Sequence, residues 1–126
     1  MQKQESKKVL AVVSDLLFSV KIAEAAKRAG LSVEFVKVGG EVLEKAGEKP
    51  LLIIFDLNFD AVDPLNVIMQ LKADPDLKQI NLIGYLSHVQ GELKQKAHET
   101  GCDMVLARSA FSQNLPQILK RHSGSL

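Results

Sequence analysis

The sequence of 126 residues has a single cysteine, Cys102, a single tyrosine and no tryptophan. One cysteine excludes an internal disulfide and a metal cluster held by thiolates, and it suits the reducing cytoplasm. Five phenylalanines and the one tyrosine are too few to indicate a surface on which nucleic-acid bases stack. No apolar run approaches the roughly 20 residues that a membrane span needs. We therefore expect a cytoplasmic protein with neither a membrane nor a nucleic acid as its partner.

Charge of one sign is not concentrated anywhere, because sixteen Lys and Arg residues are interleaved with fifteen Asp and Glu residues, for a net charge of +1. The sequence therefore contains no block like the basic stripe of a nucleic-acid-binding protein. Its polar start leads directly into apolar residues, without the small-residue cleavage pattern of a secretory signal. We expect residues 1–7 to form a polar leader, residues 8–122 one domain and residues 123–126 a tail.

Short apolar runs alternate along the chain with longer segments of helical period. The runs predict strands at Val9–Val13, Leu31–Val38, Leu51–Phe55, Ile80–Leu86 and Met104–Ala107. The segments between and after them predict helices at Leu16–Ala29, Glu41–Ala46, from Pro64 through Leu71, Gln90–Thr100 and Phe111–Arg121. Apolar strands alternating with helices are typical of a parallel sheet that is covered by helices on both faces.

The right-handed crossover rule leaves two main topologies for this alternation, the flavodoxin-like strand order 2-1-3-4-5 and the Rossmann order. In both, functional residues lie where the strands end. The polar residues at these positions are Ser14, Asp15, Asp56, Asn58, Ser87, His88, Arg108 and Ser109.

Two carboxylates, Asp15 and Asp56, follow the first and third predicted strands. These strands are neighbours in the flavodoxin-like order, so the carboxylates should converge on one crevice. Together with a backbone carbonyl they would form a plausible Mg²⁺ site, since Mg²⁺ takes one or two carboxylates from a protein and keeps several waters. The alternative for Asp15 is a simple helix N-cap, a position that Asp favours.

Three segments resemble the receiver domains of bacterial two-component systems. They are LLIIFDLNF, QLKADPDLKQINLIGYLS and GCDMVLARS, and the similarity extends from Val9 to Leu119. The resemblance implies an α/β, flavodoxin-like, three-layer doubly wound fold with a five-stranded parallel sheet in the order 2-1-3-4-5 and five helices. It also implies a signalling role without enzyme activity of its own, with a histidine kinase or a downstream effector as protein partner.

The resemblance further assigns roles at the strand ends. Asp56 matches the phosphoacceptor, while Asp15 and the carbonyl of Asn58 would help it to hold Mg²⁺. Ser87 matches the hydroxyl that turns toward the phosphoryl group, and Arg108 stands at the lysine that contacts it. A carboxylate nucleophile, a metal that clamps charge and fixed donors for an anion are the physical requirements of this chemistry.

The sequence departs from the receiver pattern in four ways. Ser14 replaces an acid and removes one carboxylate from the metal shell. Arg108 replaces lysine, and its planar guanidinium is not equivalent to a compact ammonium. Ser109 and Ala110 replace Pro and Phe, so the path after the fifth strand should differ. His88 replaces a small residue, and its imidazole would restrict access to the phosphoacceptor.

His88 also suggests a sharper hypothesis. Its imidazole would hydrogen-bond to Asp56 or Asp15 and form, with Arg108, a fixed arrangement that substitutes for metal and phosphate. The alternative is a loop histidine without a role.

Three functions therefore remain open. The first is a stand-alone receiver-like signalling domain in a phosphorelay, with Asp56 as phosphoacceptor. The second is a pseudo-receiver, an interaction module with the same fold that works without phosphorylation. The third is a flavodoxin-like enzyme or small-ligand protein that uses the same crevice.

Overall fold

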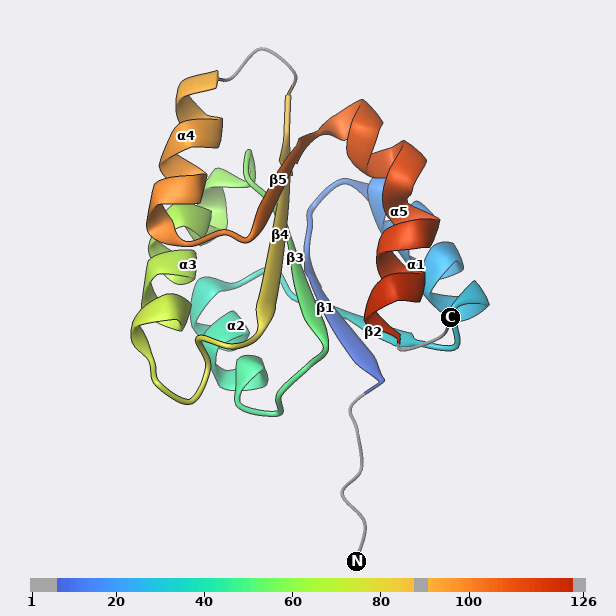
Figure 1. Ribbon diagram of the computed structural model, residues 1–126, viewed down its shortest axis with the longest axis horizontal. Helices are drawn as coiled ribbons and strands as arrows, with labels where there is room; N and C mark the ends of the chain where they lie inside the picture. Colours follow the sequence, from blue (N-terminus) through green and yellow to red (C-terminus); the bar gives the residue numbers. More distant parts are fainter. Residues whose placement is uncertain (1–6, 88–90, 124–126) are drawn as a thin grey trace, which may run out of the picture.

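The computed structural model describes residues 7–87 and 91–123. Within these residues the chain forms one parallel sheet in the order β2-β1-β3-β4-β5, with helices on both of its faces (Figure 1). This is the flavodoxin-like order, so that prediction is confirmed and the Rossmann order is excluded. The strands are β1 Lys8–Val12, β2 Ser32–Phe35, β3 Leu52–Asp56, β4 Asn81–Leu86 and β5 Met104–Ala107.

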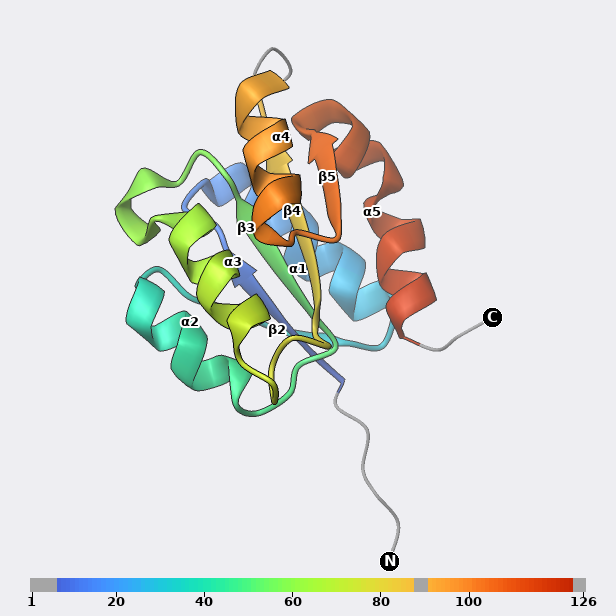
Figure 2. The same cartoon turned by 60° about the vertical axis from the view of Figure 1, so that its left-hand side comes forward.

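The helices form two layers with the sheet between them (Figure 2). Helices α1, Leu16–Arg28, and α5, Arg108–His122, lie side by side on one face. The other face is covered by α2 Gly39–Ala46, α3 Pro64–Ala73 and α4 Gly91–Thr100, and one turn of 3-10 helix, η1 Asp60–Val62, precedes α3. The strands are parallel because each is connected to the next through a helix. All five strands therefore end at the same side of the sheet, which we call the carboxyl edge.

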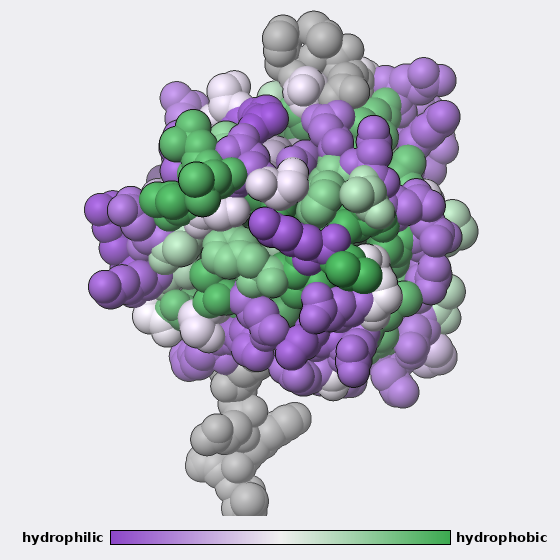
Figure 3. All heavy atoms as spheres, turned by 180° about the vertical axis from the view of Figure 1, so that it is seen from behind, coloured by the Kyte–Doolittle hydropathy of each residue, from purple (hydrophilic) through white to green (hydrophobic). Residues whose placement is uncertain are grey.

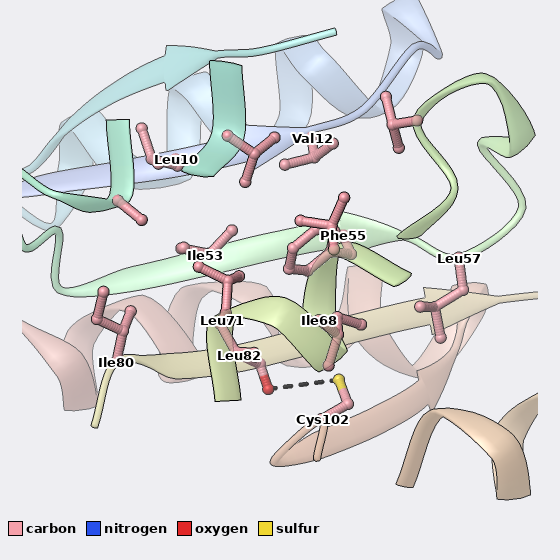
Figure 4. Packing of buried hydrophobic residues seen from close by; sticks show 14 of the residues in the cluster. Leu10, Val12, Ile53, Phe55, Leu57, Ile68, Leu71, Ile80, Leu82 and Cys102 are labelled. Carbon is pink, nitrogen blue, oxygen red and sulfur yellow. Dashed lines mark hydrogen bonds between the residues drawn. The ribbon is translucent and has the colours of Figure 1, made fainter. Parts of the chain in front are cut away.

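The middle of the sheet is apolar on both faces because it is covered on both. Every side chain of β3 is buried, including that of Asp56 at its end. Figure 4 shows the layer beneath α3, where side chains from three strands meet those of the helix. Its labelled members include Leu10, Val12, Ile53, Phe55, Leu82, Ile68 and Leu71.

Close packing also fixes the chain directly after Asp56. A Cβ atom at Gly84 would lie 2.8 Å from Cδ1 of Leu57, so only glycine leaves room for this leucine against β4. The amide of Leu57 donates to the carbonyl of Tyr85 at 2.9 Å. The end of β3 is therefore attached to β4 by packing and by a hydrogen bond.

Several element boundaries differ from the sequence prediction, most of them by one residue. β2 ends at Phe35 and not at Val38, because its partner β1 ends at Val12 and Val38 is exposed. α2 begins at Gly39, two residues earlier than predicted. α5 begins at Arg108 and not at Phe111, so β5 leads into α5 without a loop. Proline disfavours the helical conformation of the residue before it. Because residue 109 is serine and not proline, Arg108 is free to adopt that conformation.

Among the described helices, none combines the length and the apolar character that crossing a membrane requires.

Candidate functional site at the carboxyl edge

The residues that the sequence places at the strand ends do meet at the carboxyl edge. Asp15 follows β1, Asp56 ends β3, Ser87 follows β4 and Arg108 follows β5. Two hydrogen-bonded contacts join residues that follow different strands: Arg108 with Asp15, and Ser87 with Asn58. His88 lies outside the described residues, so the hypothesis for its imidazole stays a prediction.

Asp15 holds the start of α1. Its Oδ1 accepts hydrogen bonds from the amides of Leu17 at 2.8 Å and Phe18 at 3.3 Å, as an N-cap residue does. Its Oδ2 accepts from Nη2 of Arg108 at 2.6 Å. Partial burial opposes ionisation of Asp15, but the two amides and the guanidinium outweigh it and hold its pKa below the usual value. Both carboxylate oxygens are thus engaged within the protein.

Arg108 is the first residue of α5, and its side chain lies on an aromatic shelf formed by Phe18, Tyr85 and Phe111. The guanidinium carbon is 4.7 Å from the ring centroid of Phe18 and 5.8 Å from that of Tyr85. The ring of Tyr85 lies 4.9 Å from that of Phe18 and 4.8 Å from that of Phe111. Cation–π attraction and the Asp15 carboxylate therefore act on the same guanidinium. The contact joins the first turns of α1 and α5.

Asp56 is the one buried charged residue among those described, with 5% of its surface exposed. The amide of Asn58 donates to its Oδ1 at 2.9 Å. Burial raises the pKa of Asp56, and the lowering effects of the Asn58 amide and the Arg108 charge do not cancel that rise. Among the described residues, this amide is the one hydrogen-bond donor to the carboxylate at the end of β3.

Asn58 connects two loops through its side chain. Its Oδ1 accepts from the amide of Ser87 at 3.1 Å and from the Ser87 hydroxyl at 3.4 Å. Its backbone carbonyl, the atom implied as a metal ligand, accepts from the amide of Asp60 at 3.0 Å. Within the described residues, Ser87 therefore donates to Asn58 and not to Arg108.

These residues do not fit Mg²⁺. Of the three implied ligands, Asp15 is engaged by Arg108 and two amides, and the Asn58 carbonyl is used in the turn. Ser14 is exposed and contributes no carboxylate. Across the described residues no group of three or more His, Cys, Asp or Glu side chains is arranged to hold a metal. The cation at this site is instead the Arg108 guanidinium.

The cysteine and the two histidines in the described part of the chain lie away from the site. Cys102 is buried, where its thiol contacts the carbonyl of Leu82 (Figure 4), and burial raises the pKa of this thiol to about 11. A thiol with this pKa is a weak nucleophile at neutral pH. His98 is exposed on α4, and His122 is half-buried with Nδ1 2.9 Å from the carbonyl of Ile118.

The sequence reasoning missed the aromatic shelf. Tyr85 stands two residues before Ser87, so the two side chains lie on the same face of β4, and this spacing is the signal that could have found it. Phe18 lies on the buried face of α1. Neither residue type predicts by itself that a guanidinium will lie on the ring.

Strand order, helix layers and the four convergent strand ends define a receiver fold, and the chain has this fold. No family model matches the sequence, and no curated protein matches it at a significant level. Solved structures similar to the chain include a response regulator of Hahella chejuensis, with a TM-score of 0.83 at 19% identity over 94% of this chain and 96% of that one.

Two further structures of this kind are similar. The chemotaxis response regulator CheY4 of Vibrio cholerae has a TM-score of 0.78 at 23% identity, covering 94% of this chain and 99% of that one. The phosphorylated cyanobacterial phytochrome response regulator RcpA has a TM-score of 0.77 at 24% identity, covering 93% and 91%.

Proposed function

We propose that the protein is a receiver-fold signalling module that acts by binding partner proteins, and that its carboxyl-edge site works without Mg²⁺ and without phosphorylation of Asp56. The observation that carries the proposal is the contact of Arg108 with Asp15 at 2.6 Å. A guanidinium in this place supplies the positive charge that a metal would supply. The likeness to response regulators favours a histidine kinase or a downstream effector as the partner.

Exposed apolar side chains next to the site support a protein-binding role. Leu16, Leu17 and Val20, which follow Asp15 on α1, are 78%, 62% and 48% exposed. A compact apolar group is visible at the upper left of the face drawn in Figure 3. Single exposed apolar residues are ordinary, but a contiguous group is typical of an interaction surface.

The test offers the protein both a metal and a phosphoryl donor. The protein and the Asp56→Asn variant are incubated with MgCl₂ and acetyl phosphate, and separately with beryllofluoride, and are followed by intact mass and by ¹H–¹⁵N spectra. We expect no added mass and no shift of the signals around Asp15 and Asp56. A phosphoryl adduct that is present on the protein and absent from Asp56→Asn would contradict the proposal.

A gain-of-function variant shows whether Ser14 and Arg108 are the reason that the protein does not bind Mg²⁺. In Ser14→Asp/Arg108→Lys the second acid and the compact ammonium return together. We expect this variant to bind Mg²⁺, with shifts confined to the carboxyl edge, whereas Ser14→Asp alone should bind it more weakly because Arg108 still occupies Asp15. Equal Mg²⁺ affinity of the protein and the double variant would show that Arg108 does not replace the metal.

The second candidate function is phosphorylation at Asp56. The position of this carboxylate at the end of β3, beside the Ser87–Asn58 contact, favours it. The adduct described above is the result that would support it.

A further inference from the structure

A cleft lies between α1 and α5, and it is separate from the carboxyl-edge site. Its volume is about 260 Å³. The lining residues are Ala25, Arg28, Ala29, Pro116 and Lys120. Small apolar groups thus form the lining together with Arg28 and Lys120, which are exposed. We call this feature the basic cleft.

The helices on the two sides of the basic cleft carry almost exclusively positive charge. α1 contains Lys21, Lys27 and Arg28 with one acid, Glu24. α5 contains three Lys and Arg residues and no acid. The opposite layer is balanced, since α2, α3 and α4 together have four Lys residues and four Glu residues. The net charge of +1 therefore conceals one strongly basic helical layer.

Four of these cations, Lys27, Arg28, Lys120 and Arg121, belong to the last turns of α1 and α5. The two helices end next to each other, far from the carboxyl edge (Figures 1 and 2). In the part of the chain that the structure describes, none of the four forms an ion pair with a carboxylate. Favourable interaction with the helix dipoles accounts for their sign. It does not account for an apolar cleft between them.

We propose that the basic cleft binds an acidic segment of a partner protein, with an apolar side chain of that segment inserted between the helices and its carboxylates on Arg28 and Lys120. Charge complementarity selects the acidic partner. The Ala and Pro lining selects an aliphatic side chain and offers no aromatic platform for a nucleic-acid base. A symmetric contact with a second copy of the chain is disfavoured, because it would bring two basic helical layers together.

The experiment uses the full chain and a labelled synthetic peptide. Its Leu residues recur at helical spacing, and Glu residues stand between them. Binding is measured by fluorescence anisotropy and mapped by ¹H–¹⁵N spectra. We expect saturable binding with shifts on α1 and α5 around the basic cleft. Replacing the Leu residues of the peptide by Ser, or its Glu residues by Lys, should weaken binding at least tenfold.

A matched pair of variants separates the cleft from general charge. Arg28→Glu/Lys120→Glu reverses the charge of the two basic residues that line the cleft. Lys94→Glu/Lys96→Glu makes the same change of net charge on exposed residues of α4. We expect at least a tenfold loss of peptide affinity in the first and less than a twofold change in the second. Because all four residues are exposed, both variants should fold, which circular dichroism checks.

Several results would overturn the proposal. They are equal losses in the two variants, shifts that map to α4, or no saturable binding of the peptide at millimolar concentration. Binding of a single-stranded oligonucleotide or of anionic vesicles without binding of the peptide would assign the cleft to another class of partner. Self-association that only the cleft variant abolishes would assign it to a second copy. None of these results depends on whether Asp56 is phosphorylated.

Discussion

Arg108 carries a positive charge at the first turn of α5, where the helix dipole alone would favour an anion. Two contacts compensate for this position: the carboxylate of Asp15 and the rings of Phe18 and Tyr85. A guanidinium is planar and stacks on a ring while it donates at its edge, and a lysine ammonium cannot do both. The aromatic shelf therefore suits arginine specifically.

Replacing Arg108 by lysine should lower the free energy of unfolding by about 1 kcal/mol, because the stacking and the 2.6 Å contact are both weakened. Urea denaturation measures the change. The Arg28→Lys variant is the control, since Arg28 is exposed, and it should stay within about 0.5 kcal/mol of the wild type. If the two substitutions have the same effect, the shelf does not stabilise Arg108.

The hydroxyl of Tyr85 is buried and has no hydrogen-bond partner among the described residues. An unsatisfied buried hydroxyl costs about 1 kcal/mol or more. Tyr85→Phe keeps the ring on the shelf and removes the hydroxyl, so we expect it to stabilise the protein by about 1 kcal/mol, or to raise Tm by about 4 °C.

The converse substitution, Phe111→Tyr, serves as the control for this measurement. It adds a second hydroxyl to the same buried shelf and should destabilise the protein. A loss of stability in Tyr85→Phe would mean that the Tyr85 hydroxyl is satisfied by a buried water.

Asp56 gives a prediction that depends on pH. Because burial raises its pKa above the ordinary value of 3.8, the folded state binds the proton more tightly than the unfolded state, and stability falls as pH rises from 3.8 through the folded pKa. Asp56→Asn removes this penalty and keeps the acceptor for the Asn58 amide. We expect the variant to be more stable at pH 7 by about 1 kcal/mol and to lose this advantage below pH 3.8. Thermal denaturation of both proteins at several pH values measures the difference in stability. If Asp56→Asn is more stable by the same amount at every pH, the raised pKa of Asp56 is not the cause.

At the scale of residues, the sequence could predict which side chains meet but not which partners they choose. Strand order alone brings Asp15, Asp56, Ser87 and Arg108 to one edge. The choice of Arg108 for Asp15 depends on a ring from α1 and a ring from β4, which no local pattern connects. The alternative prediction for Asp15, a helix N-cap, is confirmed by its bonds to two amides.

At the scale of elements, the start of α5 decides where Arg108 lies. β5 ends at Ala107 and the helix begins at the next residue, which directs the side chain onto the shelf. The serine at 109 predicted a path after β5 that differs from that of receivers, and this stays a prediction. The sequence could not predict a helix start at Arg108, because no N-capping side chain marks Ala107.

Ser109→Pro tests this junction. Proline at 109 fits the first turn of a helix, but it moves the preceding residue out of the helical conformation, and that residue is Arg108. We expect a loss of about 1–2 kcal/mol and the disappearance of the coupling between Arg108 and Asp15 in a double-mutant cycle. Ser109→Ala, which leaves the helix start intact, should change stability by less than about 0.5 kcal/mol. Unchanged coupling in Ser109→Pro would refute the role of the junction.

The strands and helices were otherwise well predicted, since continuous apolar runs and glycine boundaries are strong signals. Gly30, which follows α1 with φ of 76°, is such a boundary. The edge strand β2 was predicted too long because alternating Val and Lys residues continue past Phe35. Length there is set by β1, its partner, and not by the alternation itself.

At the scale of the whole molecule, charge is organised in a way that composition hides. The two basic segments lie far apart in the sequence, at 21–28 and 108–121, and become neighbours only because α1 and α5 cover the same face. Taken alone in the sequence, each segment looks like the basic residues that are usual near the C-terminus of a helix. The prediction that no basic stripe exists in the sequence holds for the linear chain, yet it does not describe the surface.

The contact between Arg108 and Asp15 joins α1 and α5 at their first residues, while the basic cleft lies between their last turns. α1 has 13 residues and is about 20 Å long. The ion pair thus connects the two helices at one end, and their buried side chains pack them against the sheet along their length. A tilt of roughly 5° about the connected end moves the far tips by about 2 Å over this length. An event at the carboxyl edge that tilts one helix against the other would therefore also change the width of the cleft at the other end.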